Sequence, residues 1–531
     1  MTTSQSNLAT ELRDHGVAVR NGWCRAFKPW RDPKTGRDYI YCGIFTTPAL
    51  IVRLDVTTGK CRTWRMPPEC MWPWGVEVTD EGHVLASSST GKLCRLDPKT
   101  GRIWVTADIG MWTWGIKRHT DGKYYFTTQD GRLFWYDAAT EKHEAFSGPE
   151  KLRPNIPTLA GDQILADGRG VRYLDPEIIC IGKGKNEQRF PLKYKTDGTG
   201  IFHLAAGPNE TVYASTIMPL YLIRYTPATG KLENLGRGAP DNGEVYSFGH
   251  CDGKLYYGCY SEGNLVCYDP AKPIRCGKPG ALTWKHNPRL ITRLGEGHMR
   301  PRAMCIDSQK RIWVGSLPTK GTRHGGLGCY NIVTRKYVNH PMVIRDQSVW
   351  ALAADSSGNA IYGGTTINNG IKPETKEAHL FAWDANRQKL LWKQEAIPGV
   401  TDYSNLLFHA GKLYGTTGNK PFSFFCFDTK KRAMEYVVPS GISGAREQSI
   451  CLGPDGNIYG ITWMVLFRWH PATGKIEELH RCLGEDAKPF GGALFHRGAV
   501  IINDRYYFSC GTKVMSLRLP KETSNNGAIK L

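Results

Sequence analysis

The sequence lacks the segments that mark a membrane protein or an exported one. Its first sixteen residues, MTTSQSNLATELRDHG, have no basic lead-in and no apolar core, so they do not form a secretory signal. No apolar run approaches the length of a membrane span. We therefore expect a cytoplasmic protein with no membrane partner. Its sixteen cysteines should be mostly reduced, buried thiols.

Short catalytic and metal-binding motifs are also missing. The chain has no CxxC pair, no HExxH, no P-loop glycine pattern and no GxSxG. These absences argue against a zinc ribbon, a zincin protease, a P-loop nucleotide site and a serine-hydrolase elbow. No specific metal site is predicted, and the cofactor stays unknown.

Like charges are not gathered into blocks, although the chain is basic. Lys and Arg number 69 against 49 Asp and Glu, a formal net charge of +20 at pH 7. Such an excess favours an anionic partner, such as an acidic glycan, or serves solubility alone. Aromatic–glycine signatures of single-strand readers are absent, so nucleic acid is an unlikely partner.

What the sequence does contain is a repeat. The stretch MWPWGVEVTDEGHVLASSSTGKLCRLDPKTGR at 71–102 is nearly repeated by MWTWGIKRHTDGKYYFTTQDGRLFWYDAATEK at 111–142. A marker, in which a strand runs into a turn of the PxTGK type, recurs at steps of mostly forty to fifty residues. Its copies lie at 53–60, 95–102, 135–142, 173–178, 224–231, 267–272, 329–336, 382–389, 426–432, 468–475 and, eroded, 513–522.

Each copy has the same internal order. A short apolar run, a DG-type turn, a second strand, a third strand ending at the marker and a fourth strand follow one another, as at 449–481. Alternating residues and DG or TG turns indicate antiparallel hairpins. No stretch of comparable length has a sustained helical period. The pattern predicts an all-β fold, a β-propeller of about ten four-stranded antiparallel blades.

The domain prediction follows from the repeat. We expect a polar N-terminal segment at 1–15, one closed propeller at 16–520 and a polar tail at 521–531. No Pro/Ser/Gly linker separates two halves, so a single ring is favoured over two smaller propellers. Residues 16–20 would then supply the outer strand of the last copy and close the ring.

Two stretches carry a resemblance to known families. RPRAMCIDSQKRIWVGSL at 300–317 and SICLGPDGNIYGITWMVLFRWHPATGK at 449–475 resemble blades of virginiamycin B lyase-like and gluconolactonase-like propellers. The architecture is also similar to propeller polysaccharide lyases and to rhamnosidases that act beside a glucuronate. FAWDANRQKLLWK at 381–393 resembles a quinoprotein blade. The triplet at 296–298 resembles the Glu/His pairing of virginiamycin B lyase-like enzymes, which implies that a divalent metal such as magnesium is possible.

Candidate site residues follow from propeller geometry. The starts of the innermost strands and the loops between second and third strands open on one face. The residues at these positions are Trp74, Trp114, His203, Tyr246, His298, Arg300, Arg302, Arg323, His324, Gln347, Tyr403 and Gln448.

The densest polar group lies in GEGHMRPR at 295–302. Arg300 and Arg302 share a face by alternation and would clamp a carboxylate. Beside them His298 would have a lowered pKa and accept a proton, while Tyr246 or His324 donates one. These are the parts needed for β-elimination on a uronate. The other interpretation is a basic cluster that solvates the rim or pairs with acids of the blades.

Tryptophans begin the first two full copies. Trp74 and Trp114 would occupy equivalent positions, where each either stacks on a sugar ring or wedges between neighbouring blades. Together with Arg323, His203 and Gln347 they complete the predicted substrate-binding set. The functional hypothesis is an enzyme, a lyase or glycoside-cleaving enzyme, that acts on an acidic, uronate-containing oligosaccharide. The alternative is a non-catalytic propeller that binds a ligand or serves as a scaffold.

Overall fold

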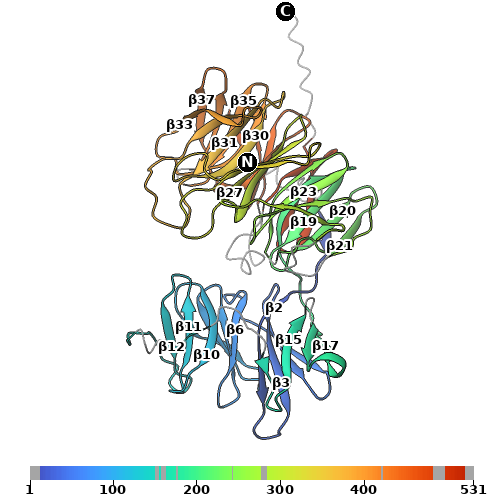
Figure 1. Cartoon of the computed structure of the whole chain (residues 1–531), viewed down its shortest axis with the longest axis vertical. Helices are drawn as coiled ribbons and strands as arrows, with labels where there is room; N and C mark the ends of the chain where they lie inside the picture. Colours follow the sequence, from blue (N-terminus) through green and yellow to red (C-terminus); the bar gives the residue numbers. More distant parts are fainter. Residues whose placement is uncertain are drawn as a thin grey trace, which may run out of the picture. The chain divides into compact units, whose positions relative to one another are not determined.

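The computed structural model describes residues 12–149, 155–156, 163–174, 178–241, 243–276, 284–419, 422–481 and 497–520. In this part of the chain, forty-four strands form eleven four-stranded antiparallel sheets, and there is no α-helix (Figure 1). This confirms the all-β class and the repeated four-stranded blade. The blades number eleven, where about ten were predicted. No helix of the described residues is long and apolar enough to cross a membrane.

Contacts within the chain divide it into two compact units. One, the four-sheet unit, consists of Val19–Gly200 and Glu485–Gly491. The other, the seven-sheet unit, consists of Met1–Ala18, Ile201–Gly484 and Gly492–Leu531. The single ring expected over 16–520 and the alternative of two smaller propellers both stay predictions, and the contacts show two compact units without a Pro/Ser/Gly-rich linker between them.

Strands of the four-sheet unit follow chain order within each sheet. The sheets are β2 (Trp23–Arg31), β3 (Asp38–Phe45), β4 (Leu50–Asp55) and β5 (Cys61–Arg65); β6 (Pro73–Val78), β7 (Val84–Ser88), β8 (Lys92–Leu96) and β9 (Ile103–Asp108); β10 (Thr113–Arg118), β11 (Tyr124–Thr128), β12 (Leu133–Tyr136) and β13 (His143–Ala145); and β14 (Gln163–Ile164), β15 (Gly170–Leu174), β16 (Ile178–Ile181) and β17 (Gln188–Pro191). A single 3₁₀ turn, Gly184–Asn186, precedes β17.

Six sheets of the seven-sheet unit have the same order. They are β18 (Ile201–Gly207), β19 (Thr211–Thr216), β20 (Tyr221–Thr226) and β21 (Lys231–Arg237); β22 (Val245–Cys251), β23 (Lys254–Cys259), β24 (Asn264–Tyr268) and β25 (Arg289–Arg293); β26 (Arg300–Ile306), β27 (Arg311–Leu317), β28 (Leu327–Asn331) and β29 (Tyr337–His340); β30 (Ser348–Ala354), β31 (Ala360–Thr366), β32 (Leu380–Asp384) and β33 (Lys389–Gln394); β34 (Tyr403–His409), β35 (Lys412–Thr417), β36 (Ser423–Asp428) and β37 (Ala433–Pro439); and β38 (Ala445–Leu452), β39 (Ile458–Thr462), β40 (Val465–Trp469) and β41 (Ile476–Arg481).

The seventh sheet joins the two ends of the chain. Its order is β1 (Leu12–Val17), β44 (Lys513–Arg518), β43 (Arg505–Cys510) and β42 (Val500–Ile502). An N-terminal strand thus supplies the outer strand of the last sheet, as expected, but it is Leu12–Val17 instead of 16–20. The predicted polar segment 1–15 therefore ends too late, and the tail 521–531 lies outside the described residues. The pairing of β1 with β44 joins the two ends of the chain within one sheet.

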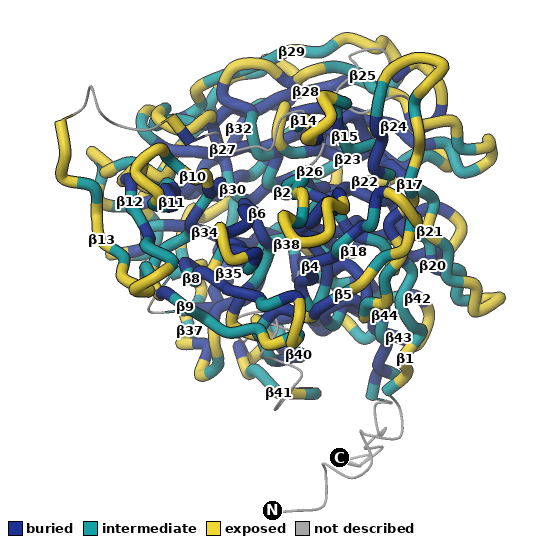
Figure 2. Tube along the Cα trace, turned by 90° about the horizontal axis from the view of Figure 1, so that it is seen from below, coloured by how far each residue is buried: buried dark blue, intermediate teal, exposed yellow. Residues whose placement is uncertain are grey.

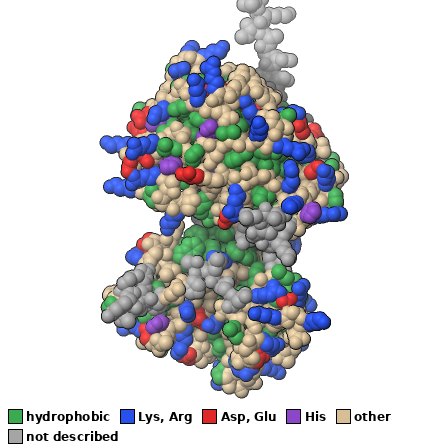
Figure 3. All heavy atoms as spheres, viewed as in Figure 1, with side chains coloured by type: hydrophobic (Ala, Val, Ile, Leu, Met, Phe, Trp, Pro, Cys, Tyr) green, Lys and Arg blue, Asp and Glu red, His purple; other side chains and the backbone are tan. Residues whose placement is uncertain are grey.

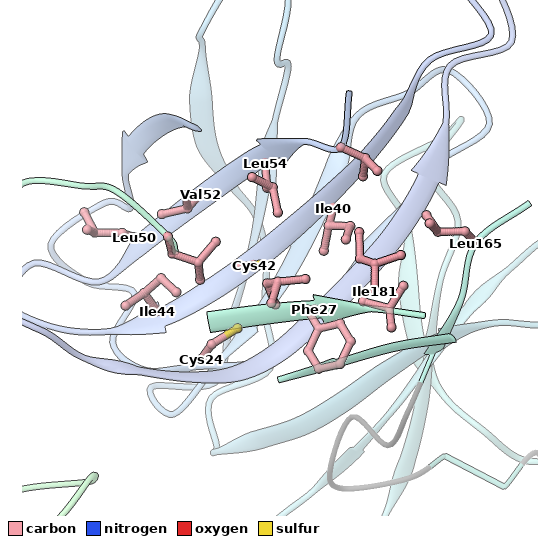
Figure 4. Close-up of a cluster of buried hydrophobic side chains, with 14 residues drawn as sticks. Cys24, Phe27, Ile40, Cys42, Ile44, Leu50, Val52, Leu54, Leu165 and Ile181 are labelled. Atoms are coloured by element: carbon pink, nitrogen blue, oxygen red, sulfur yellow. The ribbon is translucent and has the colours of Figure 1, made fainter. Parts of the chain in front are cut away.

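Apolar faces of adjacent sheets pack on one another and make the core. In the four-sheet unit, Ile40, Cys42 and Val52 of the first sheet pack in one cluster with Leu165 and Ile181 of the fourth (Figure 4). Residues of the seven-sheet unit pack in the same way between successive sheets. Exposed residues fall mainly in the turns (Figure 2). Alternation along each strand sends one set of side chains to each neighbour.

Candidate functional site

A β-bulge near the start of the inner strand recurs in the blades. The first strands of neighbouring sheets contact one another, as β2 and β6 or β22 and β26 do, and in the seventh sheet β42 contacts β18 in the same way; these are the inner strands. In nine of these strands the pairing with the second strand shifts register within the first few residues, and a bulge aims the extra side chain away from the ladder. In the seven-sheet unit the residues at the shift are Phe202, Tyr246, Arg302, Trp350, Ser404 and, in a longer bulge, Arg446 and Glu447.

These bulged residues meet at one end of the seven-sheet unit, which we call the mouth. Arg302 Nη1 lies 3.1 Å from Glu447 Oε1, and Arg497 Nε lies 3.1 Å from Glu447 Oε2. Arg446 Nη2 lies 4.0 Å from the same carboxylate. Side chains of Arg302 and Arg497 are only 13% and 5% exposed. Three buried guanidinium groups therefore surround one carboxylate.

Aromatic rings separate the arginines from one another. The guanidinium carbons of Arg302 and Arg497 lie 4.6 and 4.8 Å from the centre of the Tyr246 ring. Arg302 also contacts the Trp350 ring at 4.5 Å, and Arg497 the Phe202 ring at 4.6 Å. Cation–π attraction of this kind is stronger when the groups are desolvated. The rings hold the guanidinium planes in fixed orientations.

The pKa values of two acids at the mouth, Glu447 and Glu244, are shifted in opposite directions. Burial would raise the pKa of Glu447, but Arg497, Arg446 and Arg302 hold it well below its usual range. Glu244, directly before β22, is 7% exposed. Burial raises its pKa to about 7, against the pull of Arg497, Arg300 and Arg302. Glu447 is therefore ionised at neutral pH, and Glu244 titrates there.

Next to this cluster lies a cavity of about 250 Å³. Burial raises the pKa of Asp402 to about 6, and the charge of Glu447 adds to this. Arg446 stacks on the indole of Trp463, 3.4 Å from its centre. Two tryptophans, two carboxyl groups, an amide and an arginine face one small space. Its polar and aromatic walls are Trp350, Thr366, Asn368, Asp402, Ser404, Phe422, Arg446, Glu447 and Trp463.

Several predicted residues do gather at the mouth. Tyr246 and Arg302 are central to it, and Arg300 stacks on Tyr260 at 4.9 Å while its charge acts on Glu244 and Tyr246. His203 stands behind: its Nδ1 lies 3.0 Å from the carbonyl oxygen of Tyr246, and burial lowers its pKa to about 3. The His203 imidazole is therefore neutral, and its contact with the carbonyl oxygen positions the backbone of Tyr246.

His298 has a different environment from the one expected. Its Nδ1 lies 2.6 Å from Ser316 Oγ and its Nε2 lies 2.9 Å from Asn339 Oδ1, which ties the segment before β26 to β27 and β29 of its own blade. The residue is 3% exposed. Its pKa is lowered to about 4, as predicted, but the cause is burial rather than the arginines. Both ring nitrogens are already engaged.

Two other predicted residues, Arg323 and Gln347, also have partners within the protein. Arg323 pairs with Glu374, and its carbonyl oxygen accepts a hydrogen bond from Asn369. Gln347 is 1% exposed and its amide donates to the carbonyl oxygen of Glu377 at 2.9 Å. His324 lies half-buried in the loop between β27 and β28.

Trp74 and Trp114 belong to the four-sheet unit, whereas the predicted histidines, Tyr246 and Arg302 belong to the seven-sheet unit. Both tryptophans lie at the bulge of an inner strand, so the register confirms that their positions are equivalent. Their rings meet edge to face at 4.8 Å, and Arg25 stacks on Trp74 at 4.8 Å. Trp74 is 5% exposed. These contacts are those of residues wedged between blades.

Five charged residues of the mouth were not predicted: Glu244, Asp402, Arg446, Glu447 and Arg497. Four of them directly adjoin or lie two positions from residues that were selected, namely Tyr246, Tyr403 and Gln448. Arg446 and Glu447 lie within the long bulge of β38, where spacing along a regular strand does not give the direction of a side chain, and the other three residues precede their strands. A positive φ of 50° at Gln448 marks the distortion.

Metal-binding residues do not cluster in the described part of the chain. No group of three or more His, Cys, Asp or Glu there is arranged to hold an ion. Of the pair at 296–298, His298 has its nitrogens bonded to Ser316 and Asn339, so this imidazole does not fit a magnesium site as placed.

Comparison with known proteins supports the repeat and goes no further. A family model described as "Outer membrane protein assembly factor BamB", of the PQQ-type propeller repeat, matches residues 49–170. The match falls outside 381–393, where the quinoprotein resemblance was noted. A chain of a structure described as "Crystal Structure of Mitotic Checkpoint Complex" has 12% identity and a TM-score of 0.44, and the match covers 60% of this chain and 90% of that one. No curated protein matches. Neither match names a lyase or a lactonase.

Proposed function

We propose that the mouth of the seven-sheet unit binds a carboxylate-bearing sugar of an oligosaccharide and cleaves the glycosidic bond beside this sugar by β-elimination. The observation that carries this proposal is the juxtaposition of Glu244, whose pKa is raised to about 7, with Arg300, Arg302 and Arg497. A carboxyl group that titrates near neutral pH among fixed cations has the properties of a general base for an acidic substrate.

The charge balance of the mouth favours an anionic ligand. Four arginines, Arg300, Arg302, Arg446 and Arg497, lie there with Glu447 as the one acid held ionised by them. A guanidinium binds a carboxylate in a bidentate fork and neutralises it. Neutralising a uronate acidifies the proton at C5, which is the first requirement of the reaction.

Glu244 is the proton acceptor in this proposal, in place of His298. Its Oε2 is buried and has no hydrogen-bond partner among the described residues. Glu244 takes the C5 proton, the electrons of that C–H bond form the C4=C5 double bond, and the C4–O bond breaks. Burial and the charge of Glu244 raise the pKa of Tyr246, which stays protonated and gives its proton to the departing oxygen.

The adjoining cavity suits the neighbouring sugar ring. Its volume of about 250 Å³ is smaller than the ~300 Å³ or more of pockets for drug-sized ligands, so it fits one ring. Trp463, with 41% exposure, offers an indole for stacking, and Asp402 and Asn368 offer hydrogen-bonding groups. Sugar rings are bound in general by this combination of aromatic face and polar edge.

Non-catalytic binding is the second candidate. Glu447 already accepts hydrogen bonds from Arg302 and Arg497, so part of the cluster satisfies itself without a ligand. Other Lys and Arg side chains are scattered over the face seen in Figure 3 instead of forming one patch. A ligand-binding protein without turnover would have the same features.

Turnover of uronate-containing oligosaccharides, followed by the absorbance of the unsaturated product, separates the two candidates. We expect the wild-type protein to react, Glu244→Gln to lose roughly 100-fold or more in kcat, and carboxyl-reduced substrates to be inert. Arg302→Lys should also lose turnover, because lysine lacks the bidentate fork that holds a carboxylate. Arg224→Lys, in a pair with Glu233 at 2.8 Å in the same unit, is its matched control and should keep turnover. Ligand binding by calorimetry without any product would favour the non-catalytic candidate. Equal turnover by Glu244→Gln would refute the proposed base.

A further inference from the structure

A second cavity lies in the seven-sheet unit, between the sheets β22–β25 and β26–β29. Its volume is about 370 Å³. Tyr256, Cys267, Asn287 and Tyr330 form its buried floor. The exposed side chains at its rim are Lys272, Lys285, His286, Arg289 and Arg335.

This cavity opens at the opposite end of the blades from the mouth. Lys254 begins β23, Asp269 follows the end of β24, and Arg335 follows β28, whereas the mouth lies where β22 and β26 begin. Successive strands of an antiparallel sheet reverse direction, so the start of β23 lies at the far end from the start of β22. The cavity is therefore independent of the proposed catalytic site.

The lining of the cavity is strongly cationic. It contains Lys254, Lys272, Lys285, Arg289 and Arg335 against the single carboxylate of Asp269, a net charge of +4 with His286 neutral. Only Lys272 reaches Asp269, at 3.5 Å. Arg289 and Lys254 both act electrostatically on the Cys267 thiol at the floor, although burial raises its pKa.

We infer that this cavity binds a small molecule that carries two linked phosphate groups. Two linked phosphate groups share a bridging oxygen and carry a charge of about −3 at pH 7, which a lining of +4 can neutralise, whereas a single phosphate carries about −1.5 to −2. Arg289 and Arg335 supply guanidinium forks for phosphate oxygens, and the lysines supply point charges. The volume of 370 Å³ falls in the range of about 300–1,000 Å³ typical of small-molecule pockets.

Calorimetric titration with inorganic pyrophosphate, orthophosphate and sulfate tests this inference. We expect pyrophosphate to bind at least 10-fold more tightly than either single anion. Its affinity should decrease when the salt concentration is raised from about 50 to about 200 mM, because salt screens a contact between charges. The triple variant Lys285→Ala, Arg289→Ala, Arg335→Ala should lose this binding. Its side chains are exposed, so its melting temperature should stay that of the wild type.

Lys430→Ala, Lys431→Ala, Lys475→Ala is the matched control. It removes the same number of exposed cations from turns of the same unit, away from the cavity. Unchanged pyrophosphate binding by this control, together with loss in the cavity variant, supports the site. An equal loss in both variants would mean that net charge alone attracts the anion, and equal affinities for pyrophosphate and orthophosphate would refute the diphosphate assignment.

Discussion

Arg302 donates a hydrogen bond of 3.1 Å to Glu447, although 145 positions separate the two residues in the sequence. They come from the inner strands of different blades, and Arg497, which precedes β42 and pairs with His203 of β18, reaches the same carboxylate. The carboxylate thus links β26, β38 and the segment before β42 at the mouth of the seven-sheet unit. Because all these groups are largely buried, the link matters for stability as well as for ligand binding.

Glu447→Gln should destabilise the seven-sheet unit by about 3–5 kcal/mol. The amide keeps the shape of the side chain but leaves buried arginines without a counter-charge. Urea unfolding would measure the free energy of unfolding. Asp252→Asn, in the exposed pair with Lys310, is the control and should cost at most about 1 kcal/mol. Equal costs for the two variants would contradict a special role for Glu447.

The blade could be predicted from the sequence because its signals are local. The marker with its TGK turn, the DG turns and the alternating strands each lie within one copy of about forty residues. The grouping of blades into two compact units could not be predicted from the sequence, because it depends on which distant sheets pack together. Leu165 and Ile40, from different sheets of the four-sheet unit, lie in one such buried cluster, and neither repeat copy contains a signal that predicts it.

The place of the candidate site in the blades could be predicted from the sequence, but the full set of its residues could not. Tyr246 and Arg302 were found because each lies at the start of an inner strand, where the side chain can face the mouth. His298 comes only two residues earlier than Arg300, but its chain segment still crosses its own blade, where Ser316 and Asn339 hold the ring. A bulge or a crossing loop changes the direction of a side chain, and spacing alone does not record it.

Trp74→Ala should lower the free energy of unfolding of the four-sheet unit by about 3–5 kcal/mol, because a wedge removed from between two blades leaves a cavity. Trp74 contacts the rings of Phe45 and Trp114 at 4.9 and 4.8 Å. Trp104→Ala, on the half-buried outer strand β9, is the matched control and should cost less than half as much. A loss of sugar binding with unchanged stability would show that Trp74 serves the ligand instead.

Glu244 should make stability fall as pH rises through neutrality. Its folded-state pKa of about 7 lies above the ordinary value of 4.5, so the folded protein holds a proton that the unfolded chain has released between these two values. Stability therefore decreases with rising pH across that window and becomes constant above it. The difference of 2.5 pKa values corresponds to about 3 kcal/mol.

Glu244→Gln isolates this effect, because glutamine resembles the protonated acid and does not titrate. Asp402, with a pKa of about 6, adds a loss of the same sign, and His298, with a pKa of about 4, adds stability as pH rises toward 6.5. Both contributions are present in wild type and variant, so they cancel in the difference. Unfolding free energies from pH 4.5 to 8.5 should show the wild type losing about 3 kcal/mol relative to the variant by pH 7. Parallel curves would mean that Glu244 has an ordinary pKa, and the proposed base would lose its main support.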